Sequence, residues 1–173
     1  TGDEKSGRIE LAGKQAGLDL PAVFAEPHIP LDAVDIVAGW KRTGAATKFA
    51  LGKLSFQNQD AEGTASGVYT QAPGTMGVID LDAHLSRGSG TAVWRYMPRV
   101  VDASVAAWLR QSILEGTADN VTLKLKGPLD HFPFTDKSGI FLITGNVSKA
   151  RLRFAESWPQ IDNIAGTLEF NGP

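Results

Sequence analysis

Residues 79–86 read IDLDAHLS, with apolar and polar side chains alternating at every position. Successive side chains of an extended chain point to opposite faces, so the four apolar residues would share one face, and the two aspartates and His84 the other. This is the pattern of a β-strand with one apolar and one solvated face. It is the clearest such pattern in the chain and predicts the fold class.

The same alternation recurs from Ile9 near the start of the chain to Phe170 near its end. Turn signals rich in Gly, Pro, Asn and Asp separate the runs. Links this short cannot carry a parallel crossover, so neighbouring strands are predicted to be antiparallel. One slip in the alternation, at residues 52–53, predicts a β-bulge. We therefore expect an all-β fold, an antiparallel meander of roughly nine to eleven strands.

One segment, residues 102–115, predicts a single amphipathic helix instead. Asp102 is a suitable N-cap, because its carboxylate can accept hydrogen bonds from the free N–H groups of the first turn. Gly116 is suited to the left-handed conformation that often follows a helix. Side chains at helical spacing form the predicted apolar face of this helix: Val105, Trp108, Leu109 and Ile113.

The chain is long enough to form a folded unit with its own core. We expect one segment of a larger protein over residues 1–173. Residues 1–7 would be a linker or a cut point, and antiparallel strands would occupy 8–97, including the alternation at 92–96, and 117–171. No run approaches the roughly 20 apolar residues of a membrane-spanning helix, and any targeting signal is expected outside these residues.

Charge and composition exclude several classes of function. The chain has 17 basic and 19 acidic residues and no cysteine. Without a concentrated basic patch we expect no nucleic-acid partner. Without cysteine there is no disulfide, thiolate metal site or cysteine nucleophile.

The sequence also lacks a catalytic or metal-binding pattern. The three histidines show no metal-ligand spacing, and no serine lies in a nucleophile-elbow motif. Asp80 and Asp82 could support acid–base chemistry of a carbohydrate-active enzyme, but the alternation explains them more simply as solvent-facing residues. We expect no enzyme, no cofactor and no metal.

A sheet with this much apolar surface needs a partner for its apolar face, and one short helix cannot cover it. Either the sheet closes into a barrel or sandwich, or the face stays open as a groove and is an interaction surface. Alternation is the same in both cases. A closed β-sandwich acting as a structural or protein-interaction module is therefore the alternative hypothesis.

The order and spacing of several short motifs resemble a known family. They are WRYMP at 94–98, AWL at 107–109, KGPL at 126–129, FPF at 132–134, GIF at 139–141, WPQI at 158–161 and GTLEFNG at 166–172. Together they are similar to the YhdP-like branch of the AsmA-like family. Met97 and Ile79 stand where the family usually has Leu. The resemblance covers most of the chain and is strongest over 94–172.

The resemblance implies a protein anchored in the bacterial inner membrane that extends through the periplasm as a long curled sheet with an apolar groove. Such proteins are thought to conduct phospholipids toward the outer membrane. Phospholipid is then the expected partner, with membrane contact through other parts of the protein and with possible partner proteins in the envelope. We expect the following residues to line the groove: Ile36, Trp40, Phe49, Leu51, Ile79, Leu81, Leu123, Leu125, Leu142 and Phe170.

Overall fold

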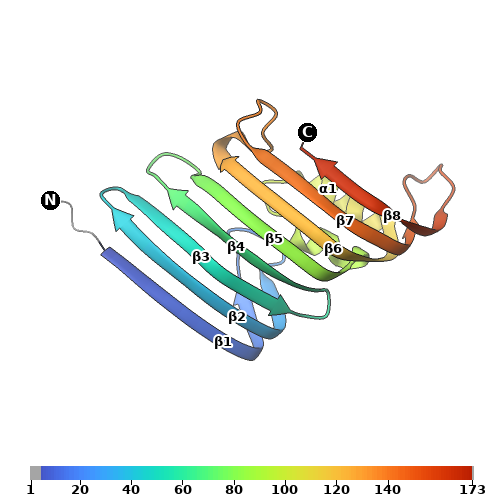
Figure 1. Ribbon diagram of the computed structural model, residues 1–173. Helices are drawn as coiled ribbons and strands as arrows, with labels where there is room; N and C mark the ends of the chain where they lie inside the picture. The colour runs from blue at the N-terminus through green and yellow to red at the C-terminus, as the bar shows by residue number, and fades with distance from the viewer. Residues whose placement is uncertain (1–4, 173) are drawn as a thin grey trace.

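The computed structural model describes residues 5–172, and almost all of this region is β-sheet. Eight long strands form one layer, with a short 3₁₀ helix and one α-helix between β5 and β6 (Figure 1). The elements are β1 (Lys5–Asp19), β2 (His28–Thr43), β3 (Ala46–Gln57), β4 (Ala61–Gln71), β5 (Val78–Ser89), η1 (Gly90–Tyr96), α1 (Ala103–Ser112), β6 (Ile113–Pro128), η2 (Leu129–His131), β7 (Ile140–Leu152) and β8 (Ile161–Asn171).

The strands follow one another across the sheet in chain order, and each pairs antiparallel with the next. The predicted all-β antiparallel meander is thus confirmed. β1 and β8 form the two edges of an open, curled sheet, in contrast to the closed sandwich of the alternative hypothesis. The bulge predicted at residues 52–53 is present as a register shift between Leu51 and Leu54. Such bulges increase local twist.

Eight strands form instead of nine to eleven because the strands are long and one expected strand is absent. Residues 92–96 were expected to continue the alternation, but they lie in the 3₁₀ helix η1. A linker was expected over residues 1–7. Residues 5–7 belong to β1 instead, and residues 1–4 lie outside the described region.

The predicted helix is shorter than expected. Asp102 is its N-cap, as predicted, with its carboxylate accepting a hydrogen bond from Ser104 N at 2.7 Å. The helix ends at Ser112, because Ile113 already pairs with Leu152 of β7. Gly116, expected to end the helix, lies inside β6 with φ of +137°.

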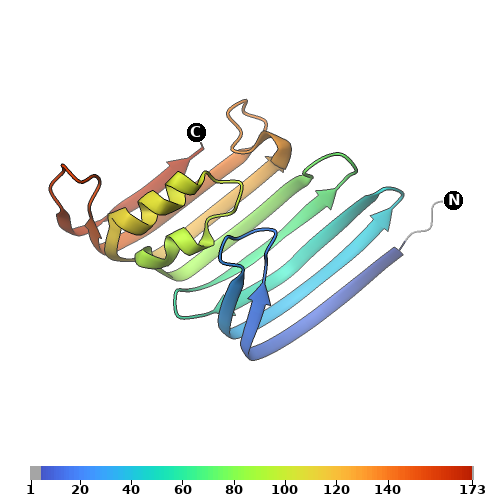
Figure 2. The ribbon, with the colours of Figure 1, turned by 180° about the vertical axis from the view of Figure 1, so that it is seen from behind.

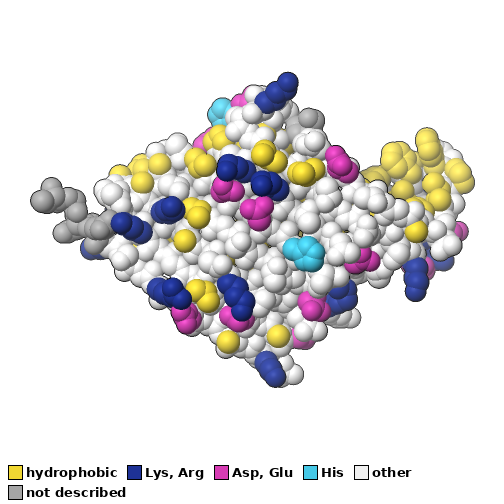
Figure 3. Space-filling view, viewed as in Figure 1, with side chains coloured by type: hydrophobic (Ala, Val, Ile, Leu, Met, Phe, Trp, Pro, Cys, Tyr) yellow, Lys and Arg dark blue, Asp and Glu magenta, His cyan; other side chains and the backbone are white. Residues whose placement is uncertain are grey.

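A cover formed by η1, α1 and the β1–β2 connection lies over one end of one sheet face (Figure 2). The opposite face, turned to the viewer in Figures 1 and 3, carries scattered Lys, Arg, Asp and Glu side chains. The connection is held to the segment after η1 by a bridge between Phe24 and Pro98 and by a hydrogen bond from Arg99 N to Val23 O at 2.8 Å. The cover therefore packs as one unit.

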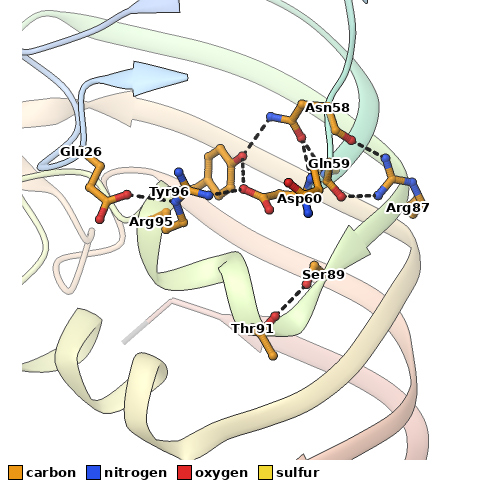
Figure 4. Close-up of polar contacts among 10 residues, drawn as sticks. Glu26, Asn58, Gln59, Asp60, Arg87, Ser89, Thr91, Arg95 and Tyr96 are labelled. Atoms are coloured by element: carbon orange, nitrogen blue, oxygen red, sulfur yellow. Dashed lines mark hydrogen bonds and ion pairs between the residues drawn. The ribbon is translucent and has the colours of Figure 1, made fainter. Parts of the chain in front are cut away.

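A polar cluster fastens this cover to the turn between β3 and β4 (Figure 4). Asn58 is only 3% exposed. Its amide oxygen accepts hydrogen bonds from Asp60 N at 3.0 Å and Ala61 N at 2.7 Å, and its amide nitrogen donates to the Tyr96 hydroxyl at 3.0 Å. Asn58 thus joins the turn to the last residue of η1.

An ion pair within this cluster connects three segments. The Arg95 guanidinium donates to Glu26 at 2.9 Å and to Asp60 at 2.9 Å, and the Tyr96 hydroxyl donates to the same Asp60 carboxylate at 3.0 Å. The hydrogen bond with Glu26 raises the pKa of Arg95, and burial raises the pKa of Tyr96. At neutral pH the Arg95 guanidinium is therefore positively charged and the Tyr96 hydroxyl is protonated.

The other end of the sheet carries the β6–β7 loop, residues 129–139. Phe134 of this loop is 5% exposed, and its ring lies against the backbone of Gly127 and Gly139. A β-carbon at Gly139 would lie 2.7 Å from the ring. Asp136 holds the loop through a hydrogen bond from Ser138 N at 3.0 Å and a contact with His131 Nδ1.

We predict that Asn58→Ala lowers the free energy of unfolding by about 1–3 kcal/mol, because it leaves the buried N–H groups of Asp60 and Ala61 without an acceptor. Urea unfolding measures this directly. The exposed neighbour Gln59→Ala is the matched control and should change stability little. Equal effects of the two substitutions would show that the cluster does not fasten the cover.

We also predict that His131 titrates above its ordinary pKa, because Asp136 stabilises its charged form, while hydrogen bonds from Ser138 and His131 lower the pKa of Asp136. The contribution of His131 to folding stability is therefore complete below its unfolded-state pKa of about 6.5. It is lost as the pH rises through the raised pKa of the folded state. The Asp136 contribution is present above about 3.9 and is lost on acidification. NMR titration should show the His131 midpoint falling in Asp136→Asn; an unchanged midpoint would contradict the pairing.

Candidate functional site

Most of the apolar side chains of the strands lie on one face of the sheet. Residues directly opposite each other in an antiparallel pair point to the same side, so the register assigns the faces. In one transverse row Ile9, Ala38, Leu51, Gly67, Leu81, Leu125 and Phe141 are successive partners. In the next row the partners are Leu11, Ile36, Leu54, Ala65, Ala83, Leu123, Ile143 and Phe170. We call this side the apolar face.

Two further apolar rows flank these. Toward the cover lies the row of Gly13, Val34, Phe56, Gly63, Leu85 and Val121; toward the β2–β3 and β4–β5 turns lies the row of Gly7, Trp40, Phe49, Tyr69, Ile79 and Gly127. The apolar face is therefore four rows deep along the strands.

Most of this face is not covered by a second layer of residues 5–172. Side-chain exposure is 56% for Ile9, 42% for Trp40 and 46% for Phe170, whereas Val34, near the cover, is 6% exposed. Within this region no large side chain is fully buried. An exposed apolar surface that extends across a whole sheet is the usual mark of an interaction site.

β4 presents only small residues to the middle of the apolar face. Gly63 and Gly67 lie close to β5, since an added β-carbon would be 2.4 Å from the carbonyl oxygens of His84 and Asp80. With Ala65 between them, they make a stripe of small residues along β4, and Leu85 and Leu81 of β5 lean over the two glycines. The stripe runs parallel to the strands, from the turn end toward the cover.

The other face is polar and is held by cross-strand pairs. Lys126 Nζ lies 2.7 Å from the Asp80 carboxylate and Lys124 Nζ lies 3.8 Å from that of Asp82. These pairs raise the pKa of Lys126, with the Asp80 hydrogen bond as the main cause. The two aspartates are thus solvent-facing members of ion pairs.

Two shallow hollows of about 540 and 670 Å³ lie on this polar face. The first is lined by Lys53, Thr64, Ser66, Asp82, His84, Thr122 and Lys124, among others, and the second extends from Lys14 of β1 to Ser86 of β5. Charged and hydroxyl side chains share the lining of these hollows with apolar groups such as Ala83 and Leu142 in the first and Ala33 in the second. The apolar face is an open surface instead.

Nine of the ten predicted lining residues share the apolar face: Ile36, Trp40, Phe49, Leu51, Ile79, Leu81, Leu123, Leu125 and Phe170. Leu142 does not, because it pairs with Lys124 and lies on the polar face. Residues 140–143 are apolar at every position, so the sequence did not show which alternate residues of this strand lie on the apolar face. Phe141 and Ile143, which sequence reasoning missed, occupy the apolar face instead.

The predicted helix face is divided in the structure. Leu109 is half-buried on α1, while Val105 and Trp108 are 41% and 40% exposed. Ile113 belongs to β6 and not to the helix. Trp108 packs against Phe154 with ring centroids 5.7 Å apart, and its Nε1 donates to Phe154 O at 3.1 Å.

Residues 5–172 contain neither a metal-binding group nor a membrane-spanning helix. No three His, Asp or Glu side chains in that range are grouped so that they could hold a metal ion. No helix among these residues has the length and apolarity needed to cross a membrane.

Comparison with known proteins identifies the family of the chain. The protein of Escherichia coli (strain K12) described as "Intermembrane phospholipid transporter YhdP" is 23% identical over 171 residues, which make up 98% of this chain and 13% of that protein. No solved structure matches the chain. The profile of the family described as "YhdP protein" matches residues 1–173. The chain therefore belongs to the YhdP protein family.

Proposed function

We propose that the apolar face carries the acyl chains of phospholipids, and that the chain is a non-enzymatic segment of a larger lipid-transfer protein. The observation that carries this proposal is the apolar face itself, which crosses all eight strands and is mostly without a second layer within residues 5–172. The larger protein would be anchored in the inner membrane, and this segment would lie in the periplasm, between the two membranes.

The energetic reason is the cost of exposing an acyl chain to water. Each buried methylene contributes about 0.8 kcal/mol, so a lipid leaving a bilayer needs a continuous apolar surface. Seven strand spacings of about 4.8 Å make the face about 34 Å wide along the sheet. A lipid can therefore stay in contact with apolar side chains while it moves from strand to strand.

Movement also requires that no position binds the lipid too tightly. The four rows, which extend from β1 to at least β6, present small, aliphatic and aromatic residues and no buried polar group with a fixed partner geometry. Many weak, nearly equivalent contacts suit transport better than one specific site. The polar face, with its exposed ion pairs, would remain in water.

The comparisons support this proposal at the level of the family. The Escherichia coli relative is described as a phospholipid transporter acting between membranes. Because the chain corresponds to 13% of that protein, it would supply one section of a longer lipid path.

We predict that Leu123→Asp lowers phospholipid binding by about tenfold or more, because it places a charge in the middle of the apolar face, where an acyl chain would desolvate it. Thr122→Asp is the matched control, since Thr122 is the neighbouring residue on the polar face. Native mass spectrometry of the purified chain with phosphatidylglycerol measures the bound fraction, and circular dichroism checks the fold.

Two results would count against the proposal. One is a chain that binds no lipid at any concentration below the micellar range. The other is equal loss of lipid in Leu123→Asp and Thr122→Asp while both variants stay folded, because binding would then not depend on the apolar face.

A further inference from the structure

We infer that a phospholipid lies on the apolar face in one direction, with its phosphate beside Lys5 and Arg42 and its acyl chains running along the strands toward η1. This inference rests on the proposed function and adds the orientation of the lipid and the residues that recognise its headgroup. It follows from the different composition of the two ends of the face.

The register places a polar row directly beyond the last apolar row. Lys5 pairs with Arg42, Arg42 with Thr47, and Thr47 with Gln71, so these four residues point to the same side as the apolar face. We call them the outer row. Its two cations are direct neighbours across β1 and β2, and the row itself contains no carboxylate.

An anion would relieve the repulsion between these neighbouring cations. The Arg42 Nε donates to the carbonyl oxygen of Gly44 at 3.3 Å, which orients the guanidinium at the end of β2. Its other N–H groups can donate to phosphate oxygens in the paired geometry that arginine favours. A phosphodiester is the anionic group that a phospholipid would bring to this position.

The row just inside the outer row contains three aromatic residues, Trp40, Phe49 and Tyr69. The rings of Phe49 and Tyr69 stack with centroids 6.2 Å apart, and the indole of Trp40 lies over Gly7. The Tyr69 hydroxyl contacts the side chain of Gln71 in the outer row. Trp and Tyr prefer the boundary between apolar and wet surroundings, which for a lipid is the level of its ester groups.

The opposite end of the face is closed. Ala61 and Ala92 are 9% and 6% exposed, and Asn58 and Ser112 are each 3% exposed, all of them at or near the cover. At the turn end Phe134 covers Gly127 on the β6 side, but Phe49 of β3 is 46% exposed. A bulky, hydrated headgroup therefore fits the open part of the turn end, at β1 to β3, whereas the apolar end of an acyl chain can lie against the cover.

The distance between the two ends suits an acyl chain. Tyr69 and Gly63 lie on the same face of β4, six residues apart, which is about 20 Å at the rise of an extended strand. Gly63, Ala65 and Gly67 lie between them, and Leu81 and Leu85 of β5 lean over the two glycines. An extended acyl chain would lie lengthwise over these leucine side chains.

The orientation can be tested with lipids that carry a quencher at known depth. Because the chain has no cysteine, Thr47→Cys in the outer row and Thr91→Cys in η1 each provide one site for a bimane fluorophore. Phosphatidylglycerol is added with a nitroxide either next to the headgroup or near the methyl end of one acyl chain. We expect the headgroup-proximal nitroxide to quench more strongly at position 47, and the methyl-end nitroxide more strongly at position 91.

A second measurement tests the headgroup contact. Lys5→Glu/Arg42→Glu should weaken binding of phosphatidylglycerol about tenfold and leave binding of diacylglycerol with the same chains unchanged. Lys41→Glu/Lys48→Glu is the matched control: it changes the net charge equally, and this cross-strand pair lies at the same end on the polar face. It should affect neither lipid.

The outcomes separate this inference from the proposed function. If the unaltered chain binds neither lipid, the proposed function fails. If it binds both lipids, but the two nitroxides quench equally at both positions or in the reverse order, the inferred orientation is wrong. The proposal that the apolar face carries acyl chains is then unaffected. Equal effects of the two charge-reversed pairs on phosphatidylglycerol would overturn the assignment of Lys5 and Arg42.

Discussion

The backbone register between neighbouring strands is the constraint on which the rest of this structure depends. It keeps alternate residues of all eight strands on one side, so that four transverse rows form a continuous apolar face. A slip of one residue in a strand would turn its whole apolar set to the other side. On the polar face the same register brings Asp80 opposite Lys126 and Asp82 opposite Lys124, and these cross-strand pairs disfavour a slipped alignment.

An open sheet of this kind has little core of its own. The few deeply buried side chains lie mainly where the cover meets the sheet or where Phe134 packs against Gly127 and Gly139. Elsewhere the apolar side chains are covered only by their neighbours in the same rows. Any apolar ligand bound to the folded sheet would add to its stability by mass action. The exposed face that weakens the isolated sheet is thus the feature that suits it to hold lipid.

Much of this arrangement could be predicted from local pattern. The alternation at residues 79–86, the short links and the slip at 52–53 predicted an antiparallel meander with a bulge. Other features depend on long-range pairing. Leu142 was assigned to the wrong side because its neighbours are also apolar, and only its pairing with Lys124 shows its face. Residues 92–96 alternate like a strand but belong to the 3₁₀ helix η1, in which Arg95 binds Asp60 and Tyr96 binds Asn58. An open and a closed sheet have the same alternation, so the sequence could not distinguish them.

The central claim is that acyl chains contact the apolar face and not the polar one. Intermolecular nuclear Overhauser effects between a bound phospholipid and the methyl groups of the chain test this most directly. Our account predicts effects from acyl methylenes to the methyls of Leu81, Leu123 and Leu125, and none to the methyls of Thr122 and Thr144, which face each other on the polar side. Effects confined to the threonine methyls, or a bound lipid whose acyl chains show none to the three leucines, would contradict it.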